Sequence, residues 1–189
     1  PSELDLPESF YRDEWKHVVQ AHGISTMEEY FGASRVGRGR SLSRMDRKRI
    51  WPVIEEYRAE LIRRGAKELV DCMRDARSIL RSKGDILPYK AIIIDEAQDM
   101  GMEAFRLLRQ MIPVSRTERS NDLFIVGDAH QRIYGHKVVL GRCGIEIRGR
   151  SHKLRVNYRT TEETRKWAVA ILSGRSFDDL DGGEDDQKG

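Results

Sequence analysis

Hydrophobic residues in the first 85 positions recur at the three-to-four-residue spacing of amphipathic helices. This spacing predicts four helices, at residues 9–21, 25–31, 46–64 and 67–82. A loop rich in Gly, Arg and Ser is expected at 32–43. Ser25 and Glu28 have the spacing of a capping box for the second helix. Pro52 predicts that the third helix begins near Ile50 or bends there.

The period changes at Tyr89, where the pattern becomes that of strands alternating with a helix. Three consecutive isoleucines at 92–94 predict a strand over 90–94 that is buried on both faces, as in a parallel sheet. A helix at 101–112 and a second strand at 122–126 follow. Because strand–helix–strand crossovers are right-handed, the carboxyl ends of both strands are expected at one edge of the sheet.

The pattern is weaker after the second strand. Short strands are expected near 145–148 and 151–156, followed by a helix at 161–172 with Trp167 in the core. From Ser173 onward the composition is acidic and Gly-rich, which is typical of a disordered end or of an end severed from its partner.

Polar residues follow both predicted strands. Asp95 and Glu96 close the first strand, and the polar stretch 127–134 follows the second. Open α/β sheets bind ligands in the crevice beyond these strand ends. Two adjacent acids suit ATP hydrolysis: Asp95 would hold Mg²⁺, directly or through water, and Glu96 would orient or deprotonate the water that attacks the γ-phosphate. A bare Asp-Glu pair more often marks a strand that ends in solvated acids; the Ala-Gln-Asp that follows and the segments further along the chain favour the ATP site instead.

The composition bounds the class of protein. With 189 residues, the chain is long enough for one domain with a sizeable core, or for one domain and pieces of another. No apolar run approaches the length of a membrane span, and no signal peptide is visible, so no membrane partner and a cytoplasmic location are expected. Cys72 and Cys143 stand far apart, which indicates neither a zinc site nor a disulfide framework. Because the first residue is Pro1, we expect an excised fragment.

The net charge is only +3, but the charges are clustered. One basic cluster comprises Arg35, Arg38, Arg40, Arg44, Arg47, Lys48 and Arg49. A second comprises Arg142, Arg148, Arg150, Lys153, Arg155 and Arg159, and the last dozen residues are acidic. Clustered arginines neutralise phosphates, so nucleic acid is one predicted partner; a solvated charged surface is the alternative.

One glycine pair has the spacing of a phosphate-binding P-loop. Gly32 and Gly37 are five positions apart, but Arg38 and Gly39 stand where Lys and Ser or Thr are required. A helix rather than a strand is also expected before them. We therefore reject this segment as a P-loop, and no other stretch of the chain matches the motif.

Three segments now stand in order: Ile-Ile-Ile-Asp-Glu-Ala-Gln-Asp at 92–99, Val-Gly-Asp-Ala-His-Gln-Arg-Ile-Tyr at 126–134 and Leu-Arg-Val-Asn-Tyr-Arg at 154–159. Together they closely resemble motifs II, III and IV of the UvrD/Rep-type superfamily 1 DNA helicases. The resemblance is specific over 91–172. Over 1–85 it is looser and is similar to the helical insertion that these enzymes carry before motif II.

The resemblance implies an α/β fold: a partial RecA-like parallel sheet of the P-loop NTPase type, preceded by a helical insertion region. Residues 1–85 would form the helical region with its basic loop. Residues 86–150 would form the second half of a first RecA-like domain, and 151–189 the start of a second one with an acidic tail.

The resemblance also implies a role for each matching residue around ATP. It implies that Asp95 binds Mg²⁺ and that Glu96 acts on the attacking water. These are the roles already inferred from the two residue types. Gln98, with Asp99 beside it, would link the nucleotide site to neighbouring loops. Gln131 would sense the γ-phosphate, with Asp128 positioning it. Arg159 would reach the γ-phosphate as an arginine finger, and Tyr158 would flank the nucleotide.

For DNA, the resemblance implies that Tyr134 lies beside a single strand, where an aromatic ring can stack on any base. Many members of the family continue with a Trp-Arg-Gly segment that also stacks on DNA, but this chain has Gly135, His136 and Lys137. We expect Lys137 and Arg142 to compensate through their charge.

The implied function is that of an ATP-dependent DNA helicase that moves on single-stranded DNA or at single/double-strand junctions. Its P-loop is expected upstream of Pro1 and its later motifs beyond Gly189, so the isolated fragment is expected to be inactive. The alternative is a non-catalytic module that binds nucleic acid or protein; a helicase-like nuclease subunit is a third reading. The oligomeric state is left open.

Overall fold

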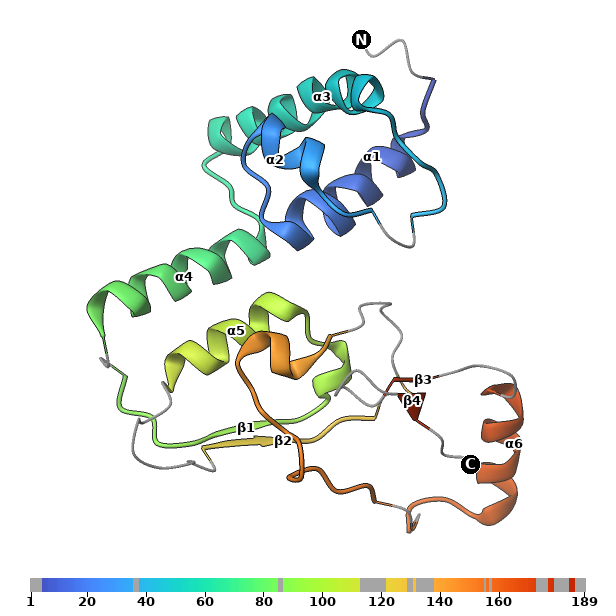
Figure 1. Ribbon diagram of the computed structural model, residues 1–189. Coiled ribbons are helices and arrows are strands. Elements are labelled where there is room, and N and C mark those ends of the chain that lie inside the picture. The colour runs from blue at the N-terminus through green and yellow to red at the C-terminus, as the bar shows by residue number, and fades with distance from the viewer. Residues whose placement is uncertain are drawn as a thin grey trace. The chain divides into compact units, whose positions relative to one another are not determined.

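The computed structural model describes residues 5–35, 38–84, 87–112, 122–128, 131, 138–154, 156, 158–172, 177–178 and 184–185. The chain divides into two compact units, Pro1–Cys72 and Met73–Gly189, and each is described by itself (Figure 1). The first unit is helical, whereas the second contains a small parallel sheet. The architecture is therefore α/β and rich in helix.

The described residues of the helical unit form α1 (Glu8–Glu14), the π-helix η1 (Trp15–Gln20), α2 (Met27–Gly32) and α3 (Arg44–Arg63), and the unit ends within the first turn of α4 (Leu69–Lys83). Figure 1 shows α1 and α2 along α3. The core is formed by buried apolar side chains from η1, α2, α3 and the loops between them: Val18, Val19, Ile24, Tyr30, Leu42, Ile50, Trp51 and Ile54. Phe10 and Tyr11 of α1 are partly buried against it. The predicted apolar spacing is confirmed for Val18 and Val19 and for Ile50 and Ile54, which lie on inner faces. It does not predict burial correctly for the helix at 69–83, which has no buried residue.

Two predicted helix starts are wrong by a few residues. Thr26, not Ser25, is the N-cap of α2, and its capping box is completed by Glu29. Helix α3 begins at Arg44, with Ser43 as its N-cap, and carries Pro52 in its interior. The cap explains the early start, because the Ser43 hydroxyl satisfies a backbone N–H that the first turn leaves unpaired.

A buried carboxylate holds the helical unit together. Glu14 is fully buried, and its two carboxylate oxygens accept hydrogen bonds of 2.7 Å each from Nε and Nη2 of Arg35. The Tyr30 hydroxyl donates to the same carboxylate at 2.8 Å. Burial, followed by the charge of Glu14, raises the pKa of Tyr30, so this hydroxyl keeps its proton. The network joins α1, α2 and the loop that follows.

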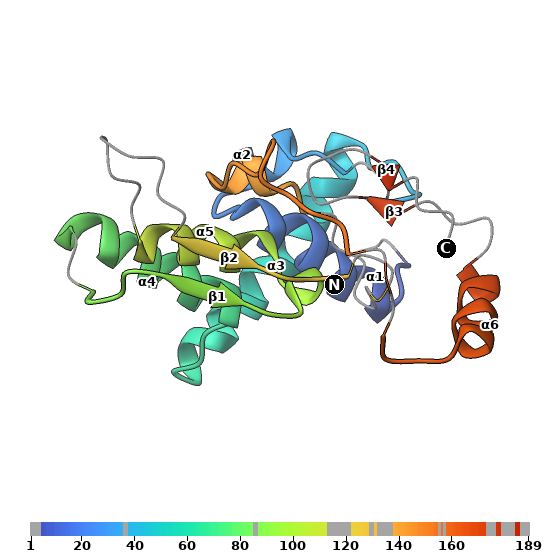
Figure 2. The ribbon, with the colours of Figure 1, turned by 90° about the horizontal axis from the view of Figure 1, so that it is seen from below.

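The second unit is built on two short parallel strands, β1 (Ile92–Ile94) and β2 (Leu123–Ile125). Their register pairs Ile92 with Leu123 and Ile94 with Ile125. Helix α5 (Met102–Met111) lies between them in sequence, so the predicted strand–helix–strand unit is confirmed. Figure 2 shows the two strands side by side. Both strands are shorter than the sequence indicated.

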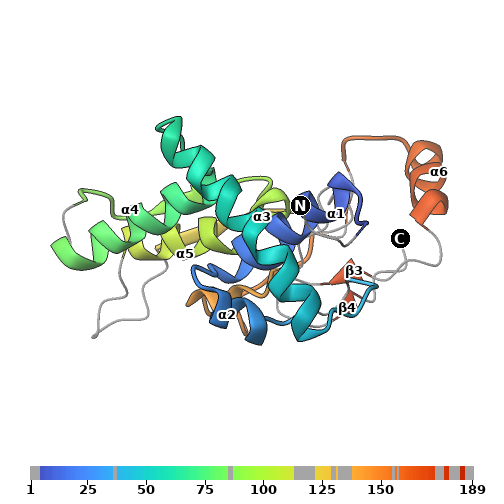
Figure 3. The ribbon, with the colours of Figure 1, turned by 90° about the horizontal axis from the view of Figure 1, so that it is seen from above.

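The remaining elements are α4 (Leu69–Lys83), the 3₁₀ turns η2 (Ala97–Asp99) and η4 (Leu140–Cys143), α6 (Glu162–Leu172), and the short antiparallel pair β3 (Phe177–Asp178) and β4 (Glu184–Asp185). Figure 3 shows α4 alongside α5, where Nη2 of Arg77 lies 3.3 Å from Oε2 of the buried Glu103. Residues 177–178 and 184–185 are paired as short strands, so these four positions are ordered, and the other residues from 173 onward lie outside the described residues.

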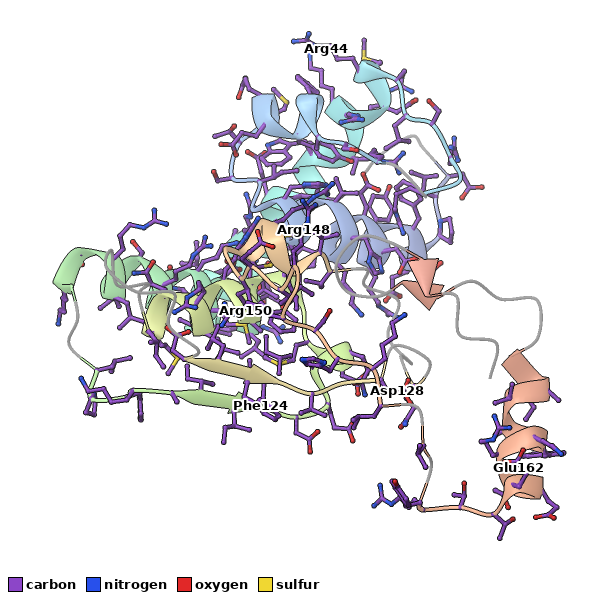
Figure 4. All side chains as sticks on the ribbon, turned by 60° about the horizontal axis from the view of Figure 1, so that its bottom comes forward. Arg44, Phe124, Asp128, Arg148, Arg150 and Glu162 are labelled. Atoms are coloured by element: carbon purple, nitrogen blue, oxygen red, sulfur yellow. The ribbon has the colours of Figure 1, made fainter. Side chains whose placement is uncertain are left out.

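Only one face of the sheet is covered by described residues. Ile94 is 5% exposed and packs with Phe105 of α5 and Leu140 of η4. On the other face, Ile93 is 78% exposed and its register partner Phe124 is 65% exposed. Figure 4 shows Phe124 on the side away from α5. The prediction of a strand buried on both faces is wrong for the described chain, because no described element covers the second face.

Two further predictions fail beyond the sheet. The described residues of 145–156 contain a turn at 148–150 and no strand. Trp167 of α6 was expected in the core but is 70% exposed. Periodicity identifies an apolar helix face but not the element that covers it, and none of the described elements covers this one. Among the described helices, none is long and apolar enough to cross a bilayer.

Candidate functional site

The candidate site begins where β1 ends. Asp95 and Glu96 follow the buried Ile94 and are both exposed. One carboxylate oxygen of Asp95, Oδ1, accepts the backbone N–H of Glu96 at 2.9 Å. The turn therefore presents two carboxylates to solvent at the carboxyl edge of the sheet, where nucleotide sites of open sheets lie.

The backbone of Glu96 is in the left-handed region, with φ 52° and ψ 39°. Among the described non-glycine residues it alone has a positive φ. This conformation costs a β-carbon-bearing residue on the order of 1–3 kcal/mol, and such strain is concentrated at functional sites. The surrounding structure must hold the turn in place.

The carboxyl end of β2 provides that support. The Ala97 N–H donates to the Val126 carbonyl at 3.0 Å, and the Val126 N–H donates to the Ile94 carbonyl at 2.8 Å. Ala97 is also fully buried. The strained residue is thus fixed between a strand and a turn that are both bonded to the neighbouring strand.

Gln98 connects the acids with the loop after β2. Its Nε2 donates to Oε2 of Glu96 at 2.6 Å, and its Oε1 accepts the backbone N–H of Asp128 at 2.9 Å. The residue is only 4% exposed, so the carboxamide is held in one orientation. Both ends of the Gln98 side chain are used, which makes it a bridge between the two strand ends.

Gly127 makes room for this bridge. A β-carbon on Gly127 would lie 2.9 Å from Oε1 of Gln98 and 3.2 Å from both the nitrogen and the β-carbon of Ala97. A separation below 3.0 Å is essentially never observed for a β-carbon, so any larger residue must displace the carboxamide. The glycine is therefore required by a close approach.

Gln131 lies at the end of the same hydrogen-bond chain. Its Nε2 donates to Oδ2 of Asp128 at 2.9 Å, and its backbone N–H donates to the Asp128 carbonyl at 3.0 Å. Figure 4 shows Asp128 beyond the end of β2. The structure thus brings together five of the predicted site residues: Asp95, Glu96, Gln98, Asp128 and Gln131.

Other predicted site residues lie outside this hydrogen-bond chain. Tyr158 is 92% exposed, and Arg159 is also exposed in the segment before α6. Arg142 is exposed on η4. Tyr134 and Lys137 lie outside the described residues.

The acids suit a cation that is held jointly with a ligand. Within the described ranges, no three or more His, Cys, Asp or Glu residues are grouped as a ready metal site. Mg²⁺ commonly uses one or two protein carboxylates together with substrate phosphates and several waters. The two exposed carboxylates of Asp95 and Glu96 are enough for a Mg²⁺ ion that is also bound by phosphates and waters. They are too few to hold the ion with protein ligands alone.

Sequence reasoning missed one feature of the site and one at the opposite end of β2. Gly127 was quoted in a motif but given no role, although a glycine directly after a buried strand is a signal for close approach. The second feature is an ion pair at 2.6 Å between Arg109 of α5 and the buried Asp122 before β2. The sequence pattern placed Asp122 at the start of the second strand, and no local pattern identified its partner.

The sequence of this chain matches a known protein family over the site and most of the helical unit. A model of the UvrD/REP helicase N-terminal domain matches residues 19–138, more than half of the chain. This chain belongs to the UvrD/REP helicase N-terminal domain family. No curated protein and no solved structure matches it.

The extent of the UvrD/REP match is informative in itself. It contains the candidate site from Asp95 to Gln131, and it also contains most of the helical unit. It ends before Tyr158 and Arg159. The helical region, for which the resemblance was loose, thus belongs to the same family domain as the two strands.

Proposed function

We propose that the chain supplies the residues that bind Mg²⁺ and the attacking water in the ATP site of a DNA helicase. This helicase would couple ATP hydrolysis to movement on single-stranded DNA. The observation that carries this proposal is the hydrogen-bond chain from Glu96 through Gln98 and Asp128 to Gln131. It joins the carboxyl ends of two parallel strands, where a nucleotide would lie in a RecA-like domain.

In this proposal the two acids divide the chemistry. Asp95 would hold Mg²⁺, and the chemistry supplied by the bound ion would be neutralisation of phosphate charge. Glu96 would accept a hydrogen bond from the attacking water and align it with the γ-phosphorus. Gln98 already holds Oε2 of Glu96, so Oε1 is the oxygen available for water. A carboxylate held in advance loses little entropy when the water binds.

Gln131 would respond to the γ-phosphate. Its carboxamide bonds to Asp128, whose backbone is joined to Gln98, so a movement of Gln131 reaches Glu96 through two residues. Tyr134 follows three positions later and would stack on a base of the DNA strand. Hydrolysis and the grip on DNA would be coupled through this short segment.

Two further parts of the proposed ATP site lie outside this hydrogen-bond chain. The 189 residues contain no Gly-x-x-x-x-Gly-Lys-Ser/Thr, so the loop that cradles the phosphates would be supplied by other residues of the full-length protein. Arg159 would approach the γ-phosphate only when a second RecA-like domain closes on the first.

The test is ATP turnover by the full-length protein that contains these residues. Glu96→Gln keeps the size of the side chain and the hydrogen bond to Gln98 but removes the base. DNA-stimulated hydrolysis should fall by about 100-fold or more, while ATP affinity stays within about threefold. Glu55→Gln, on the exposed surface of α3, is the matched control and should leave turnover unchanged. Unchanged hydrolysis in Glu96→Gln would favour a non-catalytic binding module instead.

A further inference from the structure

The structure separates the basic cluster of residues 35–49 into two groups. Three of its arginines point inward. Arg35 binds the buried Glu14 with two hydrogen bonds, and the side chain of Arg38 is only 18% exposed, 3.8 Å from Asp13. Arg47 donates to the carbonyls of Phe31 and Ala33 at 3.1 and 3.0 Å. These three residues stabilise the helical unit and are not available to a partner.

The other four face solvent. We call them the α3 cationic surface: Arg40, Arg44, Lys48 and Arg49. The sequence 35–49 contains one acid, Asp46, which accepts hydrogen bonds from the N–H and hydroxyl of Ser43 and interacts electrostatically with Arg40 and Arg49. Figure 4 shows Arg44 extending from the amino-terminal end of α3.

This arrangement is unfavourable for the isolated chain. The amino terminus of a 20-residue helix carries partial positive charge, which disfavours cations in its first turns. Arg44 and Lys48 are also four residues apart on one helix face, where like charges repel. Each effect costs roughly a few tenths of a kcal/mol. A polyanion would relieve both.

One member of the surface is held in position. The guanidinium carbon of Arg44 lies 4.6 Å from the ring centroid of Phe31, which limits the orientations of the side chain. An arginine stacked in this way keeps its N–H groups in the plane of the fork, and that geometry matches two phosphate oxygens at once.

We propose that the α3 cationic surface binds the phosphate backbone of nucleic acid. Three of its four residues are arginines. The four positive charges and the negative charge of Asp46 give a net charge of +3. Contacts of this kind position a strand without reading its sequence. The identity of the polymer as nucleic acid rests on the proposed function, but the surface itself is independent of the candidate ATP site.

The test measures binding of a fluorescently labelled 20-nucleotide single strand, and of the matching duplex, to the full 189-residue chain without ATP. The surface variant is Arg40→Gln, Arg44→Gln and Lys48→Gln. Glutamine has nearly the helix propensity of the residues it replaces, so the fold should be retained. The control variant removes the same number of charges from exposed positions elsewhere: Arg81→Gln, Lys83→Gln and Lys166→Gln.

The surface variant should lose at least tenfold in affinity near 0.1 M salt. The slope of log affinity against log salt should fall by about 2 on the single strand and by about 3 on the duplex, because three phosphate contacts are lost. The control variant should stay within twofold. Arg40→Lys with Arg44→Lys should keep most of the affinity and the full slope, since the charges remain.

Three results would overturn the proposal. The two triple variants could lose affinity equally, which would indicate net charge alone. The surface variant could bind as well as the unchanged chain. Poly-glutamate could displace the labelled strand as effectively as unlabelled DNA, which would point to an acidic protein partner. Because no ATP is present, failure here is separate from failure of the proposed hydrolysis, and Glu96→Gln should bind DNA normally.

Discussion

Gln98 donates a 2.6 Å hydrogen bond to Oε2 of Glu96. The same carboxamide accepts the N–H of Asp128, which lies 30 positions further along the chain. The orientation of Glu96 is therefore set by the loop after β2 as well as by its own strained backbone. Any change at the second strand end should be transmitted to the carboxylate at the first.

Gly127→Ala is the sharpest structural test of this bridge. The new methyl group would meet Oε1 of Gln98 at 2.9 Å, so the carboxamide should move and release the Asp128 N–H. Amide exchange should accelerate at Asp128, while the Val126 N–H, bonded to Ile94, keeps its protection. The strain should lower the free energy of unfolding by about 1–3 kcal/mol.

Gly141→Ala is the matched control for that substitution, since no atom lies within 4 Å of its added β-carbon. It should leave amide exchange at Asp128 unchanged. If Gly127→Ala also leaves this exchange rate unaltered, the close approach does not constrain the bridge. Adding Gln98→Ala to Gly127→Ala should give less than the sum of the two single effects, because the colliding atom is gone.

A second prediction concerns the buried pair in the helical unit. Glu14→Gln leaves the guanidinium of Arg35, whose side chain is 6% exposed, without its charged partner. Removing one member of a buried pair typically costs about 3–5 kcal/mol. Urea denaturation followed by fluorescence of Trp15 and Trp51 would measure this loss. Glu8→Gln breaks an exposed pair with Arg12 and should leave the midpoint unchanged.

The pH dependence of the helical unit gives a third prediction. Burial, and then the charges of Arg38 and Lys16, lower the pKa of His17 below its usual value. The folded state therefore favours the neutral ring. The stability contributed by His17 is present above the usual pKa of about 6.5 and is lost as the pH falls through the lowered value.

Urea midpoints measured from pH 7.5 down to pH 5 would follow this loss. His17→Gln cannot be protonated in this range, so its midpoint should vary less with pH than that of the unchanged chain. Equal slopes for the two proteins would show that His17 does not contribute to the acid sensitivity of the fold.

The parts of the fold that were predictable depend on local periodicity. The spacing of Val18 and Val19 identified a buried helix face, and the runs at 92–94 and 122–126 identified two strands whose ends carry the acids. The grouping of Asp95 with Gln131 followed from the handedness of the crossover. These inferences need only neighbouring residues and a general rule of chain topology.

The parts that were not predictable depend on distant partners. Nothing near Glu14 in the sequence indicates that Arg35 neutralises it, so this buried ion pair was not predicted. The Gly127 requirement arises from the Gln98 side chain, which comes from another strand end. Trp167 and Ile93 have apolar character, but exposure is decided by which elements cover them, and periodicity carries no such information.

The central claim is that Asp95, Glu96 and Gln131 surround the reacting phosphate of ATP. The most direct measurement is a crystal structure of the full-length protein with a non-hydrolysable ATP analogue and Mn²⁺ in place of Mg²⁺. We expect anomalous density for Mn²⁺ within about 5 Å of the Asp95 carboxylate, a reach that allows one bridging water. We expect the γ-phosphate beside Gln131. A nucleotide bound elsewhere, with Asp95 and Glu96 facing open solvent, would contradict the account.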